Sequence, residues 1–362
     1  MSIDIAAKRT GVKAIQLESW EAENSRPSLA QLRKLAAVYR RPLAAFYLPE
    51  PPTRFEVMHD FRRPATHNAP PESSPKLALE IRKAYDRREW ALELMREIDE
   101  TPVPFNATAT LKDDVEQVAT RLRAALGVSL AVQCTWRTDR EAFKQWRLLL
   151  ERAGLLTFQA TDLEMSEARG FSVSAKPLPV VVVNMKDAPR GRIFTLLHET
   201  VHIMLNDGGI CDLHDADAEA FCNKVAGAAL FPKTELLNSA VVGRHRKGEM
   251  RWSDAELQEL SREFGGSREA ALVRFLTLRL TSQEFYERQR REFLEQYQKQ
   301  QREQAGFAPP HVVALSSAGP LFTSLVIENF NRDRITASDV SDYLQIRVKH
   351  LHELQSEFVW SA

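Results

Sequence analysis

The sequence has few cysteines, no long apolar run and no net charge, and each absence excludes a class of protein. Three cysteines among 362 residues, at 134, 211 and 222, form no paired framework and no CxxC motif, which suits a reducing compartment better than secretion. The longest apolar run, at 178–183, is far too short to span a bilayer. Basic and acidic residues number 49 each, so no global field attracts nucleic acid or a membrane. We therefore expect a cytoplasmic protein without a signal peptide or a membrane segment.

The composition is ordinary for a soluble protein, with 44% hydrophobic and 27% charged residues, and the length suits two or three domains. Apolar periodicity predicts an α+β fold that is mainly helical. Turn signals and changes in composition divide the chain into five parts. These are an N-terminal helical unit (1–52), a bridge with a linker and a long helix (53–104), a central unit with a small sheet (105–235), a helical region (236–304) and a C-terminal helical region (305–362).

The most informative stretch, 194–205, reads FTLLHETVHIML and holds His198, Glu199 and His202 at HExxH spacing. Residues four apart lie on one face of a helix, so both imidazoles can bind one metal ion. A catalytic zinc site uses three protein ligands and keeps its fourth position for water, whose proton Glu199 would accept as general base. The alternative is that these residues merely decorate a helix. The apolar neighbours argue against it, because burying unpaired histidines is costly.

A third ligand is expected on the next helix, where 217–232 reads DAEAFCNKVAGAALFP. Glu219 is the first carboxylate inside its periodic part, and Asn223 follows four residues later on the same face. We predict Glu219 as the third ligand. Cys222 is interpreted as a buried packing thiol, with a place near the metal as the alternative. Competing ligands occupy a polar loop upstream: His214, Asp212, Asp215 and Asp217.

The runs RGRIFTLLHETVHIML, GGICD and EAFCNKVAGAALFP together resemble the ImmA/IrrE family of bacterial and phage zinc metallopeptidases. The resemblance implies a zincin-like core in which His198, His202 and Glu219 hold Zn²⁺ and Glu199 is the base. It also implies a protein substrate, a helix-turn-helix repressor whose cleavage switches on an operon. The chain departs from the commonest family pattern by apolar changes that leave these ligands intact, at Phe221, Val225 and Ala229.

Residues 1–52 predict a short helix, a turn at Gly11 and further helices, with eight basic against five acidic residues. This segment is similar to the XRE-type helix-turn-helix module that often precedes ImmA/IrrE peptidases. The resemblance implies a recognition helix that starts near Val12, and we expect the module's usual first helix to be missing before Ser2. A docking or dimerisation module is the alternative. The resemblance implies that Lys13 and Gln16 contact base edges. It also implies phosphate contacts by Lys8, Arg9 and Arg26.

The remaining segments predict helices around a small sheet. A long amphipathic helix should pack on the peptidase or on a second protomer of a homodimer. One edge of the sheet could pair with a substrate backbone, although it could equally only support the active helix. His245 is interpreted as a surface residue rather than a substrate contact. The expected helices are 76–100, 111–126, 139–153 and 282–304, with a helix, a Gly265-Gly266 turn and a helix at 254–280 that should pack rather than bind DNA; the expected strands are 155–159, 170–174 and 179–184.

Together these patterns predict a zinc-dependent endopeptidase with a DNA-binding module. Two other functions remain open. One is a DNA-binding transcriptional regulator whose zinc-site domain is a sensor or scaffold without proteolysis. The other is a partner in a toxin-antitoxin-like pair.

Overall fold

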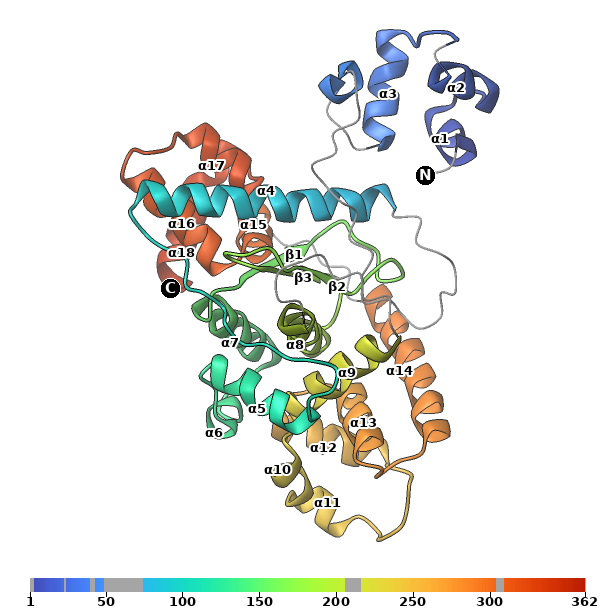
Figure 1. The fold of residues 1–362 in the computed structure, drawn as a ribbon, viewed down its shortest axis with the longest axis vertical. Helices are drawn as coiled ribbons and strands as arrows, with labels where there is room; N and C mark the ends of the chain where they lie inside the picture. Colours follow the sequence, from blue (N-terminus) through green and yellow to red (C-terminus); the bar gives the residue numbers. More distant parts are fainter. Residues whose placement is uncertain are drawn as a thin grey trace.

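The computed structural model describes residues 3–22, 24–39, 43–48, 74–205, 216–303 and 309–361. Within them the chain is mainly helical with one three-stranded sheet, so the predicted α+β class is confirmed (Figure 1). No single described helix is long and apolar enough to cross a membrane. Helices α15 (Pro310–Ala318) and α16 (Pro320–Asn331) reach that length together, but they meet at 109° and their buried side chains pack in a core of the protein.

The N-terminal unit consists of short helices: α1 (Ile3–Thr10), α2 (Ala14–Glu21), α3 (Leu29–Tyr39) and the 3-10 helix η1 (Leu43–Tyr47). Gly11 joins the first two with φ 71°, a left-handed conformation that glycine adopts without a steric penalty. The predicted sequence of short helix, glycine turn and second helix is therefore confirmed. The unit has a small apolar cluster of its own, centred on Ala6, Ala7, Leu17 and Leu35.

The sheet has the order β1-β3-β2, with β1 (Leu156–Ala160), β2 (Gly170–Val173) and β3 (Val180–Asn184). The central strand β3 runs parallel to β1 and antiparallel to β2. Its four consecutive valines are buried, which is typical of a strand covered on both faces. The three predicted strands are confirmed, and each of their ends lies within one residue of the predicted position.

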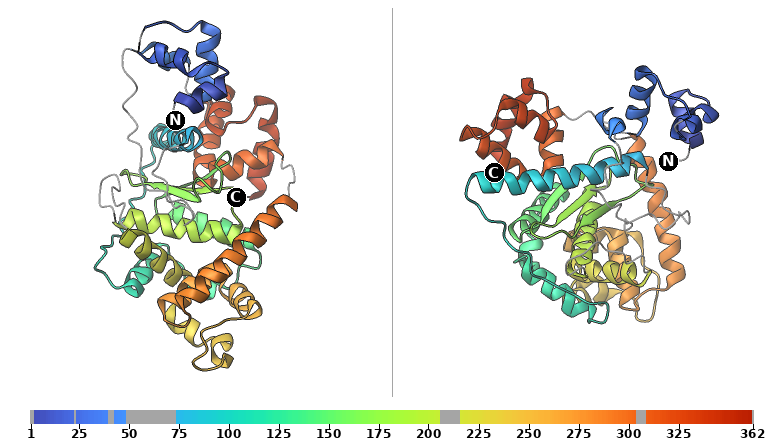
Figure 2. Two further views of the ribbon diagram at one scale, coloured as in Figure 1. Left: turned by 90° about the vertical axis from the view of Figure 1, so that its right-hand side faces the viewer. Right: turned by 45° about the horizontal axis from the view of Figure 1, so that its top comes forward.

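The sheet separates two apolar cores because alternate side chains of a strand point to opposite faces. Val180 and Val182 belong to the core beneath α4 (Pro75–Glu97) and the C-terminal helices. Val181 and Val183 belong to the core around α7 (Asp139–Arg152) and α8 (Pro189–Leu205). Figures 1 and 2 show α4 on one side of the sheet and α8 on the other. The predicted long helix thus packs on the central unit of its own chain.

The other helices extend the two cores. The helix expected at 111–126 begins at Val115 as α5, because the carboxylate of Asp114 caps it by accepting hydrogen bonds from the backbone N–H groups of Glu116 and Gln117, each at 3.0 Å.

The remaining elements are α5 (Val115–Ala125), α6 (Leu130–Gln133), α9 (Ala216–Leu230), α10 (Lys233–Leu237), α11 (Ala240–Arg244), α12 (Asp254–Phe264), α13 (Arg268–Thr277), α14 (Gln283–Glu303), α17 (Ala337–Leu344), the 3-10 helix η2 (Val348–His350) and α18 (Leu351–Ser361).

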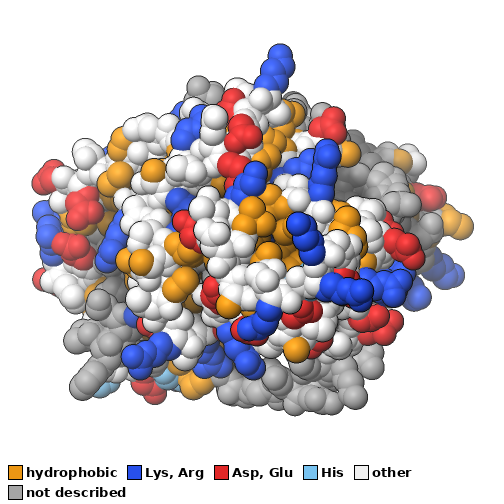
Figure 3. Space-filling model, turned by 90° about the horizontal axis from the view of Figure 1, so that it is seen from below, with side chains coloured by type: hydrophobic (Ala, Val, Ile, Leu, Met, Phe, Trp, Pro, Cys, Tyr) orange, Lys and Arg blue, Asp and Glu red, His pale blue; other side chains and the backbone are white. Residues whose placement is uncertain are grey.

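The predicted helix, Gly265-Gly266 turn and helix are confirmed as α12 and α13. Their apolar side chains are buried in the core around α8, among them Leu257, Leu260 and Phe275, which supports a packing role for this pair. Seen from below, the molecule has positive and negative side chains interspersed around small apolar areas, in keeping with its balanced charge (Figure 3).

Candidate metal centre and active site

The start of α8 is held by residues just before the HExxH array. The Asp187 carboxylate accepts a hydrogen bond from the backbone N–H of Ala188 at 2.8 Å, and Pro189 is the first helical residue, where its missing N–H costs nothing. Gly191 lies against the same carboxylate, since a Cβ there would stand 2.6 Å from an Asp187 oxygen. These contacts set where the helix begins and hence which of its residues face the sheet.

The structure brings together three side chains that sequence reasoning named as metal ligands. The Nε2 atoms of His198 and His202 lie 3.0 Å apart, and the Glu219 carboxylate lies 3.4 Å from the first and 3.1 Å from the second. Both histidines are buried, and Glu219 is about one third exposed. Within the described part of the chain, this is the one cluster of at least three His, Cys, Asp or Glu residues arranged so that it could hold a metal ion.

The donor separations fit a tetrahedral ion. Bonds of about 2.0 to 2.1 Å at a tetrahedral angle place two donors about 3.3 Å apart. The separations of 3.0, 3.1 and 3.4 Å bracket that value. Two imidazoles and one carboxylate also match a donor set that catalytic zinc sites use, with one coordination position left over.

The electrostatics of the cluster favour the ionised form of the Glu219 carboxylate. Burial alone would raise the pKa of Glu219, but hydrogen bonds and charge interactions with His198 and His202 outweigh it and lower the pKa well below the usual range. Burial raises the pKa of the neighbouring Cys222 thiol to about 11, although a hydrogen bond to His202 opposes the shift. Cys222 is fully buried and is not one of the three clustered donors, in keeping with a packing role beside the site.

The helix that carries Glu219 is anchored at its far end. Backbone carbonyls at a helix C-terminus have no partner within the helix and need donors from elsewhere. Here side chains from α5, α6 and α13 supply them: Arg123 donates to Ala229 at 2.7 Å, Gln133 to Leu230 at 3.0 Å and Arg274 to Phe231 at 2.8 Å. This polar cap holds α9 against its neighbours and so fixes where Glu219 meets the histidines.

The general-base candidate Glu199 is positioned by strand β2. The Ser172 hydroxyl donates to a carboxylate oxygen of Glu199 at 3.1 Å, and both side chains are buried. Sequence reasoning missed Ser172. The only signal was its place in the predicted strand 170–174, next to the active helix. A hydrogen bond to one oxygen restricts rotation of the carboxylate, so Ser172 is a positioning residue for Glu199.

Gly170 lets β2 approach α8 closely, and this contact yields a testable prediction. A Cβ at Gly170 would lie 2.4 Å from Cγ2 of Thr195 and 2.7 Å from the Val182 carbonyl oxygen. We expect Gly170→Ala to destabilise the fold by about 1 to 3 kcal/mol through overpacking, and to displace β2 from Glu199. Urea unfolding monitored by circular dichroism measures the change.

The matched control is Gly243→Ala, because a Cβ at that helical glycine meets nothing within 4 Å. This control should be neutral or slightly stabilising. Equal unfolding midpoints for the two variants would contradict the close approach of β2 to α8.

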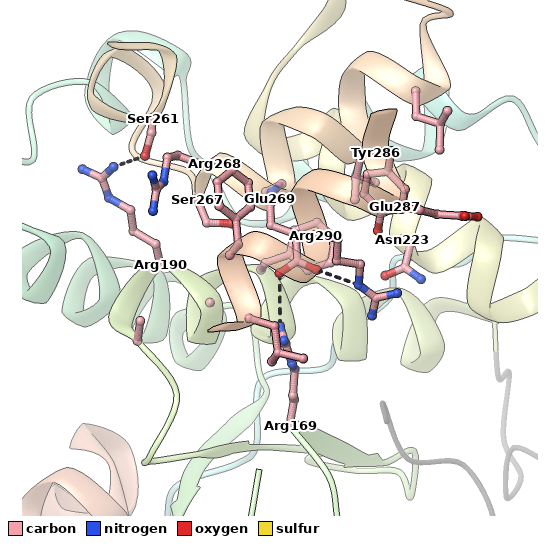
Figure 4. A pocket seen from close by; sticks show the side chains of 18 of the residues that line it. Arg169, Arg190, Asn223, Ser261, Ser267, Arg268, Glu269, Tyr286, Glu287 and Arg290 are labelled. Carbon is pink, nitrogen blue, oxygen red and sulfur yellow. Dashed lines mark hydrogen bonds and ion pairs between the residues drawn. The ribbon is translucent and has the colours of Figure 1, made fainter. Parts of the chain in front are cut away.

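A cavity of about 1310 Å³ opens on the Glu219 side of α9. Its walls come from the start of α8, from α9 and from α12, α13 and α14, and Figure 4 shows polar side chains converging from these elements. Glu219 and Asn223, the pair predicted to share a helix face, both line it. The cavity exceeds the roughly 300 to 1,000 Å³ of small-molecule pockets, which favours an extended ligand.

Other candidates from the sequence are not part of this cluster. His245 stacks on Trp252 with ring centroids 3.6 Å apart and lies 2.8 Å from Glu256, so it packs on its neighbours and does not line the cavity. Asp217 is exposed at the start of α9, and the competing ligands Asp212, His214 and Asp215 lie outside the described residues. The residues predicted to contact DNA are all exposed on the N-terminal unit: Lys8, Arg9, Lys13, Gln16 and Arg26.

Comparison with known proteins bears on the part of the chain that carries this cluster. Neither the curated proteins nor the solved structures contain a match to the chain. Residues 150–276 match the family model of the IrrE N-terminal-like domain, a peptidase family, and this range includes the whole sheet, α8, α9 and the three clustered donors. The match supports the resemblance to ImmA/IrrE peptidases, and with it a metallopeptidase, for the central part of this chain.

Proposed function

We propose that the protein is a zinc-dependent endopeptidase of the HExxH type. The observation that carries the proposal is the convergence of His198, His202 and Glu219 on one point, with Glu199 on the same helix held by Ser172. A purely structural role leaves this arrangement unexplained, because it gathers the buried ionisable groups His198, Glu199 and His202 beside Glu219, which lines a large cavity.

Each residue has a defined task in peptide hydrolysis. His198, His202 and Glu219 would hold the metal. Bound zinc supplies Lewis acidity, which activates water and polarises the scissile carbonyl. Glu199 accepts the proton of the attacking water and then delivers it to the leaving amine, while Ser172 keeps the carboxylate in one orientation.

The sheet supports binding of an extended peptide. In the described residues no strand pairs with the outer edge of β2, and β2 packs directly on α8. A peptide added antiparallel or parallel to β2 would use its backbone groups, which is a general mode of peptide recognition. Such a strand would run past Glu199, where hydrolysis takes place.

The Ser172 contact yields a second prediction. We expect Ser172→Val to lower kcat about tenfold, with KM and metal content unchanged, because Glu199 loses the donor that orients it. Ser172→Thr is the matched control, since threonine and valine have the same shape and threonine keeps the hydroxyl. Steady-state kinetics on a fluorogenic peptide measure both variants. Equal kcat for the threonine and valine variants would show that the hydroxyl has no positioning role.

We further propose that the substrate is a helix-turn-helix repressor and that the N-terminal unit binds DNA. The exposed residues Lys8, Arg9 and Arg26 suit phosphate contacts, and the exposed Lys13 and Gln16, at the start of α2, suit base edges. Incubation of the zinc-loaded protein with the repressor encoded by a neighbouring gene tests the first part: discrete fragments should appear and a chelator should prevent them. A gel shift of the operator that weakens with salt tests the second part.

A further inference from the structure

The cavity beside Glu219 has an excess of positive charge among the residues that line it. Eight lining residues are basic and five are acidic, and one of the acidic residues, Glu219, belongs to the metal cluster. The basic residues are Arg169, Arg190, Lys224, Arg262, Arg268, Arg279, Arg290 and Arg291; the acidic residues are Asp139, Asp187, Glu219, Glu269 and Glu287. Four of the basic side chains are in ion pairs: Arg190 with Asp139, Arg268 with Asp254, and both Arg169 and Arg290 with Glu269. The excess of basic over acidic side chains in the lining favours an anionic ligand.

We call the arginine-bearing part of the cavity lining the basic wall. It includes an ion-pair group of three residues from separate segments of the chain. Glu269 of α13 lies 3.6 Å from Arg169, which precedes β2, and accepts a hydrogen bond from Arg290 of α14 at 3.2 Å (Figure 4). All three side chains are only partly exposed, so solvent screens their charges less than those of surface residues. The group thus presents two guanidinium groups and one carboxylate to the cavity.

This group lies close to the proposed site of hydrolysis. Arg169 directly precedes Gly170, whose Cβ position is 3.6 Å from Cγ of Glu199. Glu219, on α9, lines the same cavity as Arg169. A peptide that runs along the outer edge of β2 past Glu199 would therefore bring neighbouring side chains to the basic wall.

We propose that the cavity is a specificity subsite for acidic side chains of the substrate, on one side of the scissile bond. Guanidinium groups recognise carboxylates through paired, charge-assisted hydrogen bonds, and Arg290 and Arg291, neighbours on α14, both line the cavity. The inference rests on the proposed endopeptidase function, because it concerns the substrate of that site. Nucleic-acid phosphates are the competing anions, and the experiment distinguishes them.

The test measures cleavage preference with the zinc-loaded full chain. A proteome-derived peptide library analysed by mass spectrometry should show Asp and Glu enriched at one or more positions near the cleaved bond. A matched pair of peptides with Glu or Gln at the enriched position should differ at least about 10-fold in kcat/KM, the effect expected of a charge-assisted hydrogen bond. Arg290→Gln should reduce that ratio several-fold. Glu269→Gln should increase it, because the carboxylate that competes with the substrate is lost.

Arg288→Gln is the matched control, because Arg288 lies on the same helix, contacts the Phe285 ring and does not line the cavity. Binding of the same two peptides to metal-loaded Glu199→Gln, measured by fluorescence anisotropy, gives a readout that is independent of turnover. Equal rates and equal affinities for the two peptides would overturn the subsite and leave the peptidase intact.

Absence of any cleavage by the loaded enzyme, with the acidic peptide still bound preferentially, would instead overturn the proposed function and keep the subsite. Duplex DNA that displaces the acidic peptide and depends on Arg290 for its binding would identify nucleic acid as the ligand and overturn the inference.

Discussion

Glu199→Gln should lower kcat/KM for a cleavable peptide by roughly 10²- to 10⁴-fold and leave the zinc content unchanged. Glutamine has nearly the shape of glutamate and can still accept the Ser172 hydrogen bond, but its amide cannot take the proton of the attacking water. Because Glu199 is not one of the three clustered donors, the metal should stay bound. Peptide cleavage followed by mass spectrometry and metal analysis by plasma emission measure the two quantities on the same sample.

The control for this prediction is Glu235→Gln, an exposed glutamate on α10 outside the cavity, which should cleave like the wild type. Residual activity of Glu199→Gln within threefold of the wild type would show that Glu199 is not the base. A regulatory effect in cells that persists in this variant would favour the sensor or scaffold function over proteolysis.

Removal of a ligand should have the second large effect. We expect His198→Ala to reduce bound zinc from about one ion per chain to below about 0.1, because two remaining donors do not make a three-ligand site. A metal that binds only the folded chain stabilises it by about 4 kcal/mol at a thousandfold excess over Kd. A chelator should therefore lower the Tm of the wild type and leave that of His198→Ala unchanged. Metal analysis after dialysis and thermal melts with and without chelator measure this.

The choice of third ligand is tested by a pair of variants. Glu219→Gln should lose the metal, because the amide carries no charge to compensate the ion, whereas His214→Ala should retain it. The opposite pattern would assign the third position to His214 and refute Glu219. Stoichiometric zinc in His198→Ala would refute the whole ligand set.

Sequence periodicity predicted the helical part of the candidate site. His198 and His202 share a face because they are four residues apart on one helix. Glu219 lies in the first turn of the next helix with an apolar periodicity. Local patterns also located the three strands and the helices of the central region, since burial on one face leaves a periodic apolar pattern and burial on both faces leaves a continuous apolar run. In each case the decisive spacing lies within a few residues along the chain.

The contacts that complete the site join residues far apart in the sequence. Ser172 meets Glu199 because β2 packs directly on α8, an approach that the missing Cβ of Gly170 permits. Arg169, Glu269 and Arg290 come from three separate elements, and no local pattern marks them as partners.

The sequence by itself determined the metal-ligand set as a hypothesis, the mainly helical class and the position of the HExxH helix, because these depend on helical periodicity and on residue chemistry. Only the tertiary structure decided which strand contacts Glu199 and which basic side chains line the cavity beside Glu219. The physical reason is that strand order and helix packing are set by burial of apolar faces over the whole domain. No characteristic spacing of residues within one stretch of the chain encodes such long-range contacts.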